Sequence, residues 1–354
     1  MIFETGSDVD FVSALLHGRR ARLAEAERLD ALCAIRTIRE LVHAIEPNAP
    51  NESVVDLQRR MVSTLADELL TFAWRIAGPA GSFLEWMAVR FQVENLKVLA
   101  RGMVTGAKLK EVEPYLVPLR KPFTLDAEAL VTADSLETFA TRISSTPLRD
   151  GVRLAAPAFE RNRRSFFIEA GLDHGYLTEL LARTGPPAVR EMPDMKTMAC
   201  QEIAMFHLDL AARGRLTYDV RPDDLLLFHV RGAGIRRAAF AAMLAAGDAQ
   251  QVAAEAAGRA IDRTSAAEAK AGEAREAVTP AMLETLALNR YYRLAYWVFR
   301  RSHIGLGTIA GYVAMRRVEL ANLITLSEGI RAGVAPAVLR RRLIPRSAEE
   351  HESV

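Results

Sequence analysis

Cysteine, aromatic residues and long apolar runs are all scarce in this 354-residue chain. Its two cysteines, Cys33 and Cys200, lie far apart within apolar helical patterns, which indicates buried thiols in a reducing compartment and not a disulfide framework. No apolar run approaches the ~18 residues that a membrane span requires. Residues 1–10 are acidic where a signal peptide would be basic and apolar. The sequence therefore predicts a cytoplasmic protein that reaches a membrane only through a partner.

Motifs that bind nucleotides or metals, or that carry out catalysis, are also missing. There is no G-x-x-x-x-G-K-[ST] phosphate loop, no G-x-S-x-G nucleophile elbow and no zinc-ligand spacing. The one Glu-x-x-His motif, Glu40 to His43, has no second copy, whereas a di-iron helical bundle needs two. We therefore expect no catalytic residue, no cofactor, no metal and no small-molecule substrate.

What the chain has in abundance is Ala, Leu, Arg and Glu, arranged with helical periodicity through almost its whole length. No alternating strand pattern occurs, so the sequence predicts an all-α fold. A repeated helix is expected to start at Ser82, where Glu85 completes a capping box. Other helices are expected at these places: 9–45 (one or two helices), 54–76, 135–144, and onward from Pro280.

A stretch near the C-terminus has a counterpart far upstream. Residues 304–333 read I-G-L-G-T-I-A-G-Y-V-A-M-R-R-V-E-L-A-N-L-I-T-L-S-E-G-I-R-A-G, and residues 83–106 read F-L-E-W-M-A-V-R-F-Q-V-E-N-L-K-V-L-A-R-G-M-V-T-G. The two copies keep one register at the following pairs: Asn95 and Asn322, Leu96 and Leu323, Gly102 and Gly329, Arg90 and Arg317. A degenerate third copy lies between them, with His207 in place of the Asn and Gly214 seven residues later.

A register kept over such a distance predicts a repeated structural unit. We expect three units: 1–122, 123–235 (degenerate) and 236–354, with a disordered tail at 346–354.

Polar side chains fall inside the apolar stripe of both clear copies: Gln92 and Asn95 in the first, Glu319 and Asn322 in the last. A polar group in such a place costs roughly 1–3 kcal/mol unless it is hydrogen-bonded. Two interpretations stay open, namely a buried polar clamp on the backbone of an adjacent helix end, or a contact with a ligand or partner. The glycines that follow suit a helix C-terminus or a tight turn.

These segments resemble the repeats of the C-subunit family of V-type ATPases, whose eukaryotic counterpart is the vacuolar ATPase d subunit. The family shows a carboxylate three residues before Asn-Leu or Asn-Ile, which Glu319 and Asn322 match. The first copy has Gln92 at the carboxylate position, and the middle copy departs from the pattern with Ala204 and His207. The resemblance covers nearly the whole chain, and its C-terminal motif is the most specific part.

The resemblance implies a role and not a reaction. The family is all-helical, with three similar subdomains in a pseudo-threefold, funnel-shaped arrangement. Its members are non-catalytic central-stalk connectors that join the membrane rotor ring to the central axle. They transmit torque for ATP-coupled H⁺ or Na⁺ transport and bind no nucleotide or metal in that role.

Clustered arginines are the candidates for partner contact, because they would complement acidic surfaces of an axle or a ring. These candidates are Arg316, Arg317, Arg340, Arg341 and Arg342. The same doublets also suit a basic helical scaffold or a nucleic-acid-binding protein, although a net charge of +2 and the lack of interleaved aromatics argue against nucleic acid. A helical enzyme with dispersed catalytic residues is a further alternative, which a closed apolar cavity with convergent titratable groups would favour.

Overall fold

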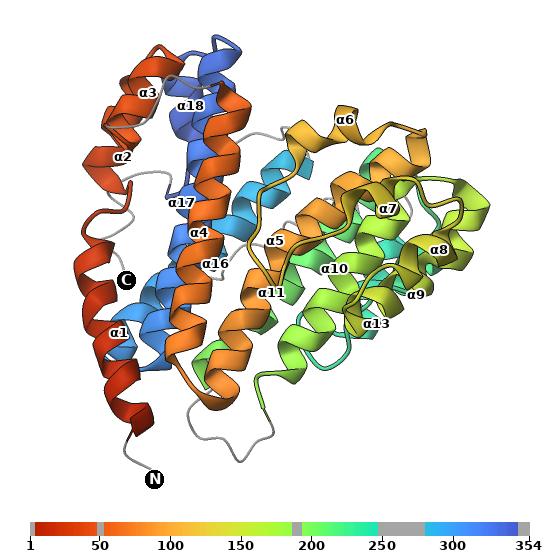
Figure 1. Cartoon of the computed structure of the whole chain (residues 1–354), viewed down its shortest axis with the longest axis horizontal. Coiled ribbons are helices and arrows are strands. Elements are labelled where there is room, and N and C mark those ends of the chain that lie inside the picture. Colours follow the sequence, from red (N-terminus) through yellow and green to blue (C-terminus); the bar gives the residue numbers. More distant parts are fainter. Residues whose placement is uncertain (1–3, 48–52, 186–192, 247–279, 346–354) are drawn as a thin grey trace.

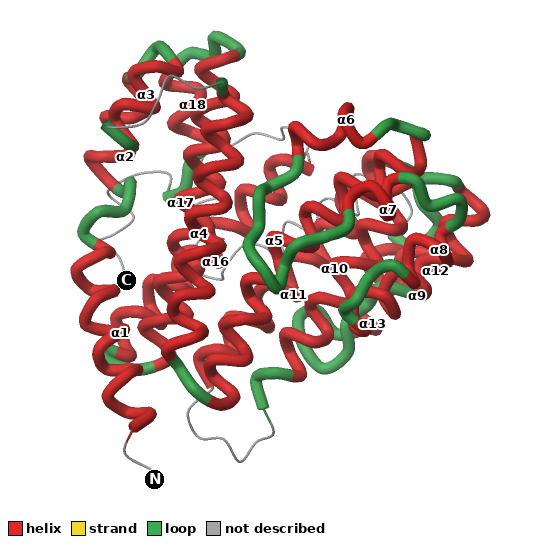
Figure 2. The backbone as a smooth tube through the Cα atoms, viewed as in Figure 1, coloured by secondary structure: helices red, strands yellow, loops and turns green. Residues whose placement is uncertain are grey.

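The computed structural model of the chain describes residues 4–47, 53–185, 193–246 and 280–345 (Figure 1). Within these ranges every regular element is a helix and none is a strand (Figure 2). The predicted all-α class is therefore confirmed. The tail expected at 346–354 lies outside the described residues.

Seven long helices form the framework: α4 (Val54–Arg75), α5 (Gly78–Thr105), α9 (Thr146–Asn162), α10 (Ser165–Ala182), α11 (Pro193–Ala211), α16 (Pro280–Ser302) and α17 (Leu306–Arg331) among the described residues. The helix α1 (Glu4–Arg20), as long as α9, packs on the outside of this framework. Shorter helices connect and cover the long ones: α2 (Ala26–Ala34), α3 (Ile38–Ile45), α6 (Leu109–Val112), α7 (Ala127–Val131), α8 (Leu136–Thr141), α12 (Pro222–Leu226), α13 (Arg237–Leu244) and α18 (Pro336–Arg342). A π-helical turn, Ala212–Thr217, continues α11.

Side-chain caps explain where several helices begin. The Ser53 hydroxyl accepts a hydrogen bond from the backbone N–H of Asp56 at 3.2 Å and starts α4, close to the predicted boundary. The Thr37 hydroxyl accepts one from the Glu40 N–H, also at 3.2 Å, and starts α3. The Thr37 cap separates α3 from α2, and a turn at 21–25 separates α2 from α1, so that the segment 9–45 contains parts of three helices where the sequence predicted one or two.

The predicted start of α5 at Ser82 is wrong. The helix begins at Gly78, because the proline that follows suits the first turn of a helix, where a missing N–H costs nothing. Ser82 therefore lies inside the helix, and its carbonyl and hydroxyl accept hydrogen bonds from Arg183 at 3.1 and 2.7 Å. At its other end α5 stops at Gly106, which has φ +68°.

The long helices form three hairpin-like pairs that close into a ring. The pairs are α4 with α5, α10 with α11, and α16 with α17. The second helix of each pair also packs on the first helix of another pair, so that α5 contacts α10, α11 contacts α16, and α17 contacts α4. This cyclic order is compatible with the expected pseudo-threefold arrangement.

Short helices occupy related places around the ring. The helices α6, α12 and α18 follow α5, α11 and α17 along the chain, and α7, α13 and α2 pack beside them or beside the long helix (Figure 2). The N-terminal helices α1, α2 and α3 pack on α17 and α18, which lie near the other end of the sequence. Each long helix that carries the motif is thus covered partly by the segment that would begin another unit.

Two apolar cores hold the ring together. The larger runs through all three helix pairs, with fully buried aromatic side chains such as Phe83, Tyr176 and Tyr291. The smaller joins the helices α2 and α3 to α4, α17 and α18, through Leu29, Leu41, Leu57, Leu326, Leu339 and others. Burial of this apolar surface is the main contribution to the stability of both cores.

Candidate functional site

The asparagine of each clear repeat clamps a returning segment of backbone. Asn95 donates through Nδ2 to the Val117 carbonyl and accepts through Oδ1 from the Val117 N–H, both at 2.8 Å. Asn322 makes the same pair of bonds with Ile344, at 2.6 and 3.0 Å. The partner lies 22 residues after the asparagine in both copies. Because a side-chain amide offers both N–H donors and an acceptor oxygen, it satisfies the two backbone polar groups of one residue, the half-buried Val117 or the buried Ile344.

The residue three positions earlier holds the segment that begins another unit. Gln92 donates through Nε2 to the Phe123 carbonyl at 3.4 Å, and Glu319 accepts through Oε1 from the Ala24 N–H at 2.7 Å. A glutamine side chain can donate to a carbonyl, whereas a carboxylate can only accept, here from an N–H. This difference accounts for the change of residue between the two copies. The leucines next to the asparagines, Leu96 and Leu323, are buried in the larger and the smaller core respectively.

The repeated glycine lies seven residues after the clamp and gives room to the short helix that follows. A Cβ atom at Gly102 would lie 2.9 Å from a Val112 methyl group. A Cβ at Gly329 would lie 2.1 Å from a Leu339 methyl group. Both glycines are inside their helices, and the turn expected from the sequence comes four residues later, where Gly106 and Gly333 have φ +68°.

The degenerate copy has a related geometry. A Cβ at Gly214 would lie 2.5 Å from a methyl group of Leu225, on the short helix α12. His207 Nε2 lies 3.1 Å from the Val230 N–H, 23 residues later, and Nδ1 lies 3.2 Å from the Ile235 N–H. Since a neutral imidazole carries one N–H of its own, only one of these contacts is a hydrogen bond at a time. The division into units 1–122, 123–235 and 236–354 stays a prediction.

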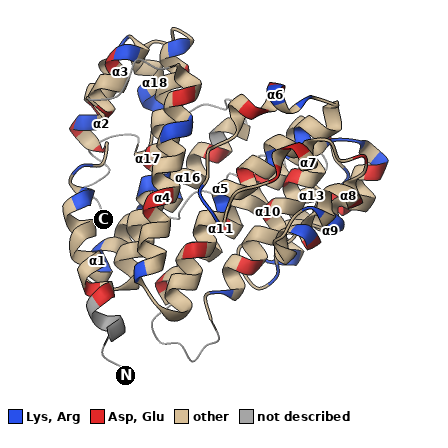
Figure 3. Cartoon of the chain, in the orientation of Figure 1, with Lys and Arg blue, Asp and Glu red and all other residues tan. Residues whose placement is uncertain are grey.

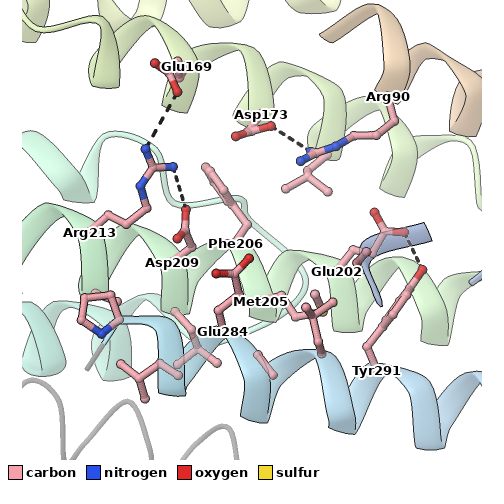
Figure 4. Close-up of a pocket in the computed structure, with 18 of the residues that line it drawn as sticks. Arg90, Glu169, Asp173, Glu202, Met205, Phe206, Asp209, Arg213, Glu284 and Tyr291 are labelled. Atoms are coloured by element: carbon pink, nitrogen blue, oxygen red, sulfur yellow. Dashed lines mark hydrogen bonds and ion pairs between the residues drawn. The ribbon is translucent and has the colours of Figure 1, made fainter. Parts of the chain in front are cut away.

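A cavity of about 530 Å³ lies between α5, α10, α11, α16 and α17 (Figure 4). About half of the residues that line it are charged: Arg90, Glu94, Lys97, Arg101, Glu169, Asp173, Glu202, Asp209, Arg213, Glu284 and Arg317. Ion pairs between helices join many of them. Arg90 donates to Asp173 at 2.8 Å, and Arg101 makes two bonds to Glu169 at 2.7 and 2.8 Å.

Glu202 is the centre of one such cluster. It accepts hydrogen bonds from Arg317 and, at 2.8 Å, from the Tyr291 hydroxyl, so that it joins α11, α16 and α17. It stands five residues before His207, as Arg90 and Arg317 stand five residues before their asparagines. Motif spacing identified Arg317 but not Glu202 or Tyr291, and this shared register is the signal that would have found Glu202.

Asp209 is the carboxyl group of the cavity whose pKa is strongly raised, whereas, against desolvation, Lys97 and Arg90 lower that of Glu94. Desolvation raises the pKa of Asp209 to about 6, and the negative charges of Asp173 and Glu284 add to the shift, while Arg213 opposes it. The Asp209 side chain is 47% exposed, and Met205, Phe206 and Ala212 are among the apolar residues that line the cavity with it. The Arg213 guanidinium is 3.6 Å from Asp209, too far for a strong bond.

The arginines expected to contact a partner differ in their surroundings. Arg316 pairs with Glu68 at 3.4 Å and with Glu319, and Arg317 pairs with Glu202. A third, Arg340, pairs with Asp30 on α2 and donates to the Pro345 carbonyl at 2.7 Å. Two more, Arg341 and Arg342, are exposed at the end of α18. Partner contact through any of these arginines stays a prediction.

The described residues contain neither a cluster of metal ligands nor a helix suited to a bilayer. Their His, Cys, Asp and Glu side chains form no group of three or more that could hold a metal ion. In the same part of the chain, no helix is long and apolar enough to cross a membrane.

Comparison with known proteins gives one consistent result. A profile of the ATP synthase (C/AC39) subunit family matches residues 12–342. The C subunit of the V-type ATP synthase of Deinococcus radiodurans is 24% identical over 181 residues, which are 48% of this chain and 51% of that protein. The C subunit of the A-type ATP synthase of Methanobrevibacter smithii is 24% identical over 216 residues, 58% of this chain and 55% of that protein.

The matched stretch thus spans about half the length of each of these curated relatives. The family profile covers much more of the chain and includes all three copies of the motif. The chain therefore belongs to the ATP synthase (C/AC39) subunit family.

Proposed function

We propose that this protein is the non-catalytic central-stalk connector of a rotary V/A-type ATPase. It links the membrane rotor ring to the central axle and transmits torque for ATP-coupled H⁺ or Na⁺ transport. It is cytoplasmic and is held at the membrane through the complex. The family and the names of the relatives support the proposal that it is a subunit of such an ATPase complex. The closed ring of helix pairs is the structural observation that carries the mechanical role.

A connector must be stiff, and the ring supplies stiffness in two ways. The helices α4, α5 and α17 have 22, 28 and 26 residues and pack along one another. Buried ion pairs such as Arg317 with Glu202 then join helices of different pairs, and breaking a pair of this kind leaves an uncompensated charge. A ring also resists bending better than an open stack, because each pair is supported on two sides.

The surface offers basic side chains for acidic partners. Arg341 and Arg342 are exposed at the end of the molecule that carries α3 and α18 (Figure 3). Arg316, Arg317 and Arg340 make internal ion pairs, so a partner that reached them would have to compete with Glu68, Glu202 and Asp30. We therefore place the electrostatic contact with an axle or ring subunit at Arg341 and Arg342.

Co-purification from the native cell tests the assignment. A tagged copy should carry with it the ATP-hydrolysing head and the membrane ring, and membranes that lack the protein should hydrolyse ATP without pumping ions. Recovery of nucleic acid, with strong retention on heparin, would instead support the basic scaffold. Full pumping in its absence would contradict a connector.

The surface contact has its own test. Replacing Arg341 and Arg342 together by Ala should weaken association with the other subunits about fivefold at low salt and reduce its salt dependence. Arg163→Ala is the matched control, since this side chain is 70% exposed on another part of the surface. Equal weakening by both variants would argue against the site.

A further inference from the structure

One of the three junctions of the helix ring has no direct chain connection. The chain runs on from α5 to α10 and from α11 to α16. The third junction joins α17 to α4, two helices from nearly opposite ends of the sequence. We call this third junction the seam. Only non-covalent contacts close it.

The N-terminal helices lie across the seam and attach to the far side. Ser13 accepts a hydrogen bond through its hydroxyl from the Gly305 N–H at 3.0 Å, and the Ala24 N–H donates to Glu319 at 2.7 Å. Further along, Asp30 pairs with Arg340 of α18. Residues 4–46, which we call the strap, are thus fixed at three successive points to the α16–α17 turn, to α17 and to α18.

A single buried carboxylate connects the strap with both helices of the seam. Glu68 of α4, with a side chain only 11% exposed, accepts from Arg19 of the strap. It also accepts from Arg316 of α17 at 3.4 Å and from the Tyr312 hydroxyl at 3.1 Å. Neutralising this one side chain would therefore weaken strap, α4 and α17 together.

The seam is also loosely packed. A cavity of about 650 Å³ lies between the strap, α4 and α17, lined by Arg19, Glu68, Arg316 and Glu319 among others. The α5/α10 junction borders the central cavity of about 530 Å³, but Trp86 there stacks on Tyr176 with ring centres 6.1 Å apart, and its indole N–H donates to the Tyr176 carbonyl at 2.9 Å. At the seam Phe72 and Tyr312 pack edge to face with ring centres 6.4 Å apart, and the contact of α4 with α17 is less extensive than that of α5 with α10. Loose polar packing lowers the free energy of local opening.

We propose that the ring opens and recloses at the seam. The strap holds the ring closed, and Glu68 is the side chain that keeps the strap in place. Opening changes the central cavity as well, because α17 turns Arg316 to the seam and the adjacent Arg317 to the central wall. Arg317 keeps α17 joined to α11 through Glu202 while the seam parts. The opening needs no partner, so its test is independent of the proposed function.

Hydrogen exchange measured by mass spectrometry on the isolated full-length protein tests the proposal. Amides of the strap, α4 and α17 should exchange together, at least about tenfold faster than those of α5 and α10. Glu68→Gln should raise the exchange of these three segments by about tenfold more, since it removes the charge that three donors share. If the unmodified protein shows the same exchange at the seam and at the α5/α10 junction, the proposal is wrong.

Glu169→Gln is the matched control, because Glu169 pairs with Arg101 across the α5/α10 junction and is likewise buried. It should leave exchange at the seam unchanged. Acceleration of the seam by this control to the extent seen with Glu68→Gln would also overturn the proposal. Should Glu68→Gln fail to fold, Arg19→Gln removes the same ion pair from a side chain that is 39% exposed.

Discussion

His207 stands where the other two copies have asparagine, and this changes how the clamp responds to acid. An amide keeps its donor and its acceptor at every pH, whereas an imidazole accepts hydrogen bonds only while it is neutral. Burial lowers the pKa of His207 to about 3, and the nearby His229 and His174 add to the shift. The folded state therefore holds the neutral imidazole against two backbone N–H groups.

Acid should weaken the fold through this residue. The pKa is about 6.5 in an unfolded chain and about 3 in the fold, so the unfolded state takes up the proton first as the pH falls. The contribution of the neutral His207 to the free energy of unfolding is complete above about pH 6.5 and is lost progressively below it. Between pH 7 and pH 5 the free energy of unfolding falls by about 2 kcal/mol through this residue. Urea denaturation at both pH values should show that His207→Asn loses about 2 kcal/mol less than the unmodified protein. Equal losses would contradict this origin.

Glycine sets the approach of two helices at the α9–α10 contact. A Cβ at Gly151 would lie 2.0 Å from the Gly171 carbonyl oxygen, and a Cβ at Gly171 would lie 2.2 Å from that of Gly151. A Cβ at Gly175 would meet the Pro147 carbonyl at 2.2 Å. The obstacles are backbone atoms, which cannot move aside as a side chain can, so the two helices can pack this closely only without side chains here.

Gly171→Ala should therefore destabilise the protein, although alanine is the better helix former by about 1 kcal/mol. We expect a net loss of about 2–3 kcal/mol from the forced separation of α9 and α10. Gly18→Ala in α1 is the control, since nothing lies within 4 Å of a Cβ there and the propensity gain stands alone. Thermal unfolding should show a lower melting temperature for Gly171→Ala and a higher one for Gly18→Ala than for the unmodified protein. A Gly171→Ala protein as stable as the Gly18→Ala protein would contradict the close contact.

The periodicity of the sequence predicted the helices better than it predicted the contacts between them. Periodicity is a property of neighbouring residues, and it is enough to predict helices and the boundaries of α4. The free-energy cost of burying an unpaired polar group then indicates that Asn95 and Asn322 are buried and hydrogen-bonded. Their partners, Val117 and Ile344, lie beyond an intervening short helix, where periodicity gives no information. The Ser82 cap failed because a proline upstream had already started the helix.

At the scale of the whole molecule, cyclic order distinguishes this protein from a linear array of repeats. In a solenoid the end repeats have one neighbour and fray first. In the ring, α4 and α17 support each other, so no helix pair is an end. The larger apolar core also runs through all three pairs without a break. Loss of any one pair exposes apolar surface on both of its neighbours.

Global unfolding should accordingly occur in one cooperative transition. A variant that keeps only Trp86, with the exposed Trp74 and Trp297 changed to Phe, reports on the α5/α10 junction by fluorescence. Its midpoint in urea should coincide with that of far-ultraviolet circular dichroism, which reports on all helices. Separate midpoints would show that the pairs unfold as independent units.

The smaller core has a consequence for synthesis on the ribosome. Asp30 leaves the exit tunnel early, and its partner Arg340 is made 310 residues later. At about 5–20 residues per second the delay is on the order of 15–60 s. Through that interval the leucines of α2 and α3 lack the part of their docking surface that α17 and α18 supply. The smaller core is therefore completed only when translation is nearly over.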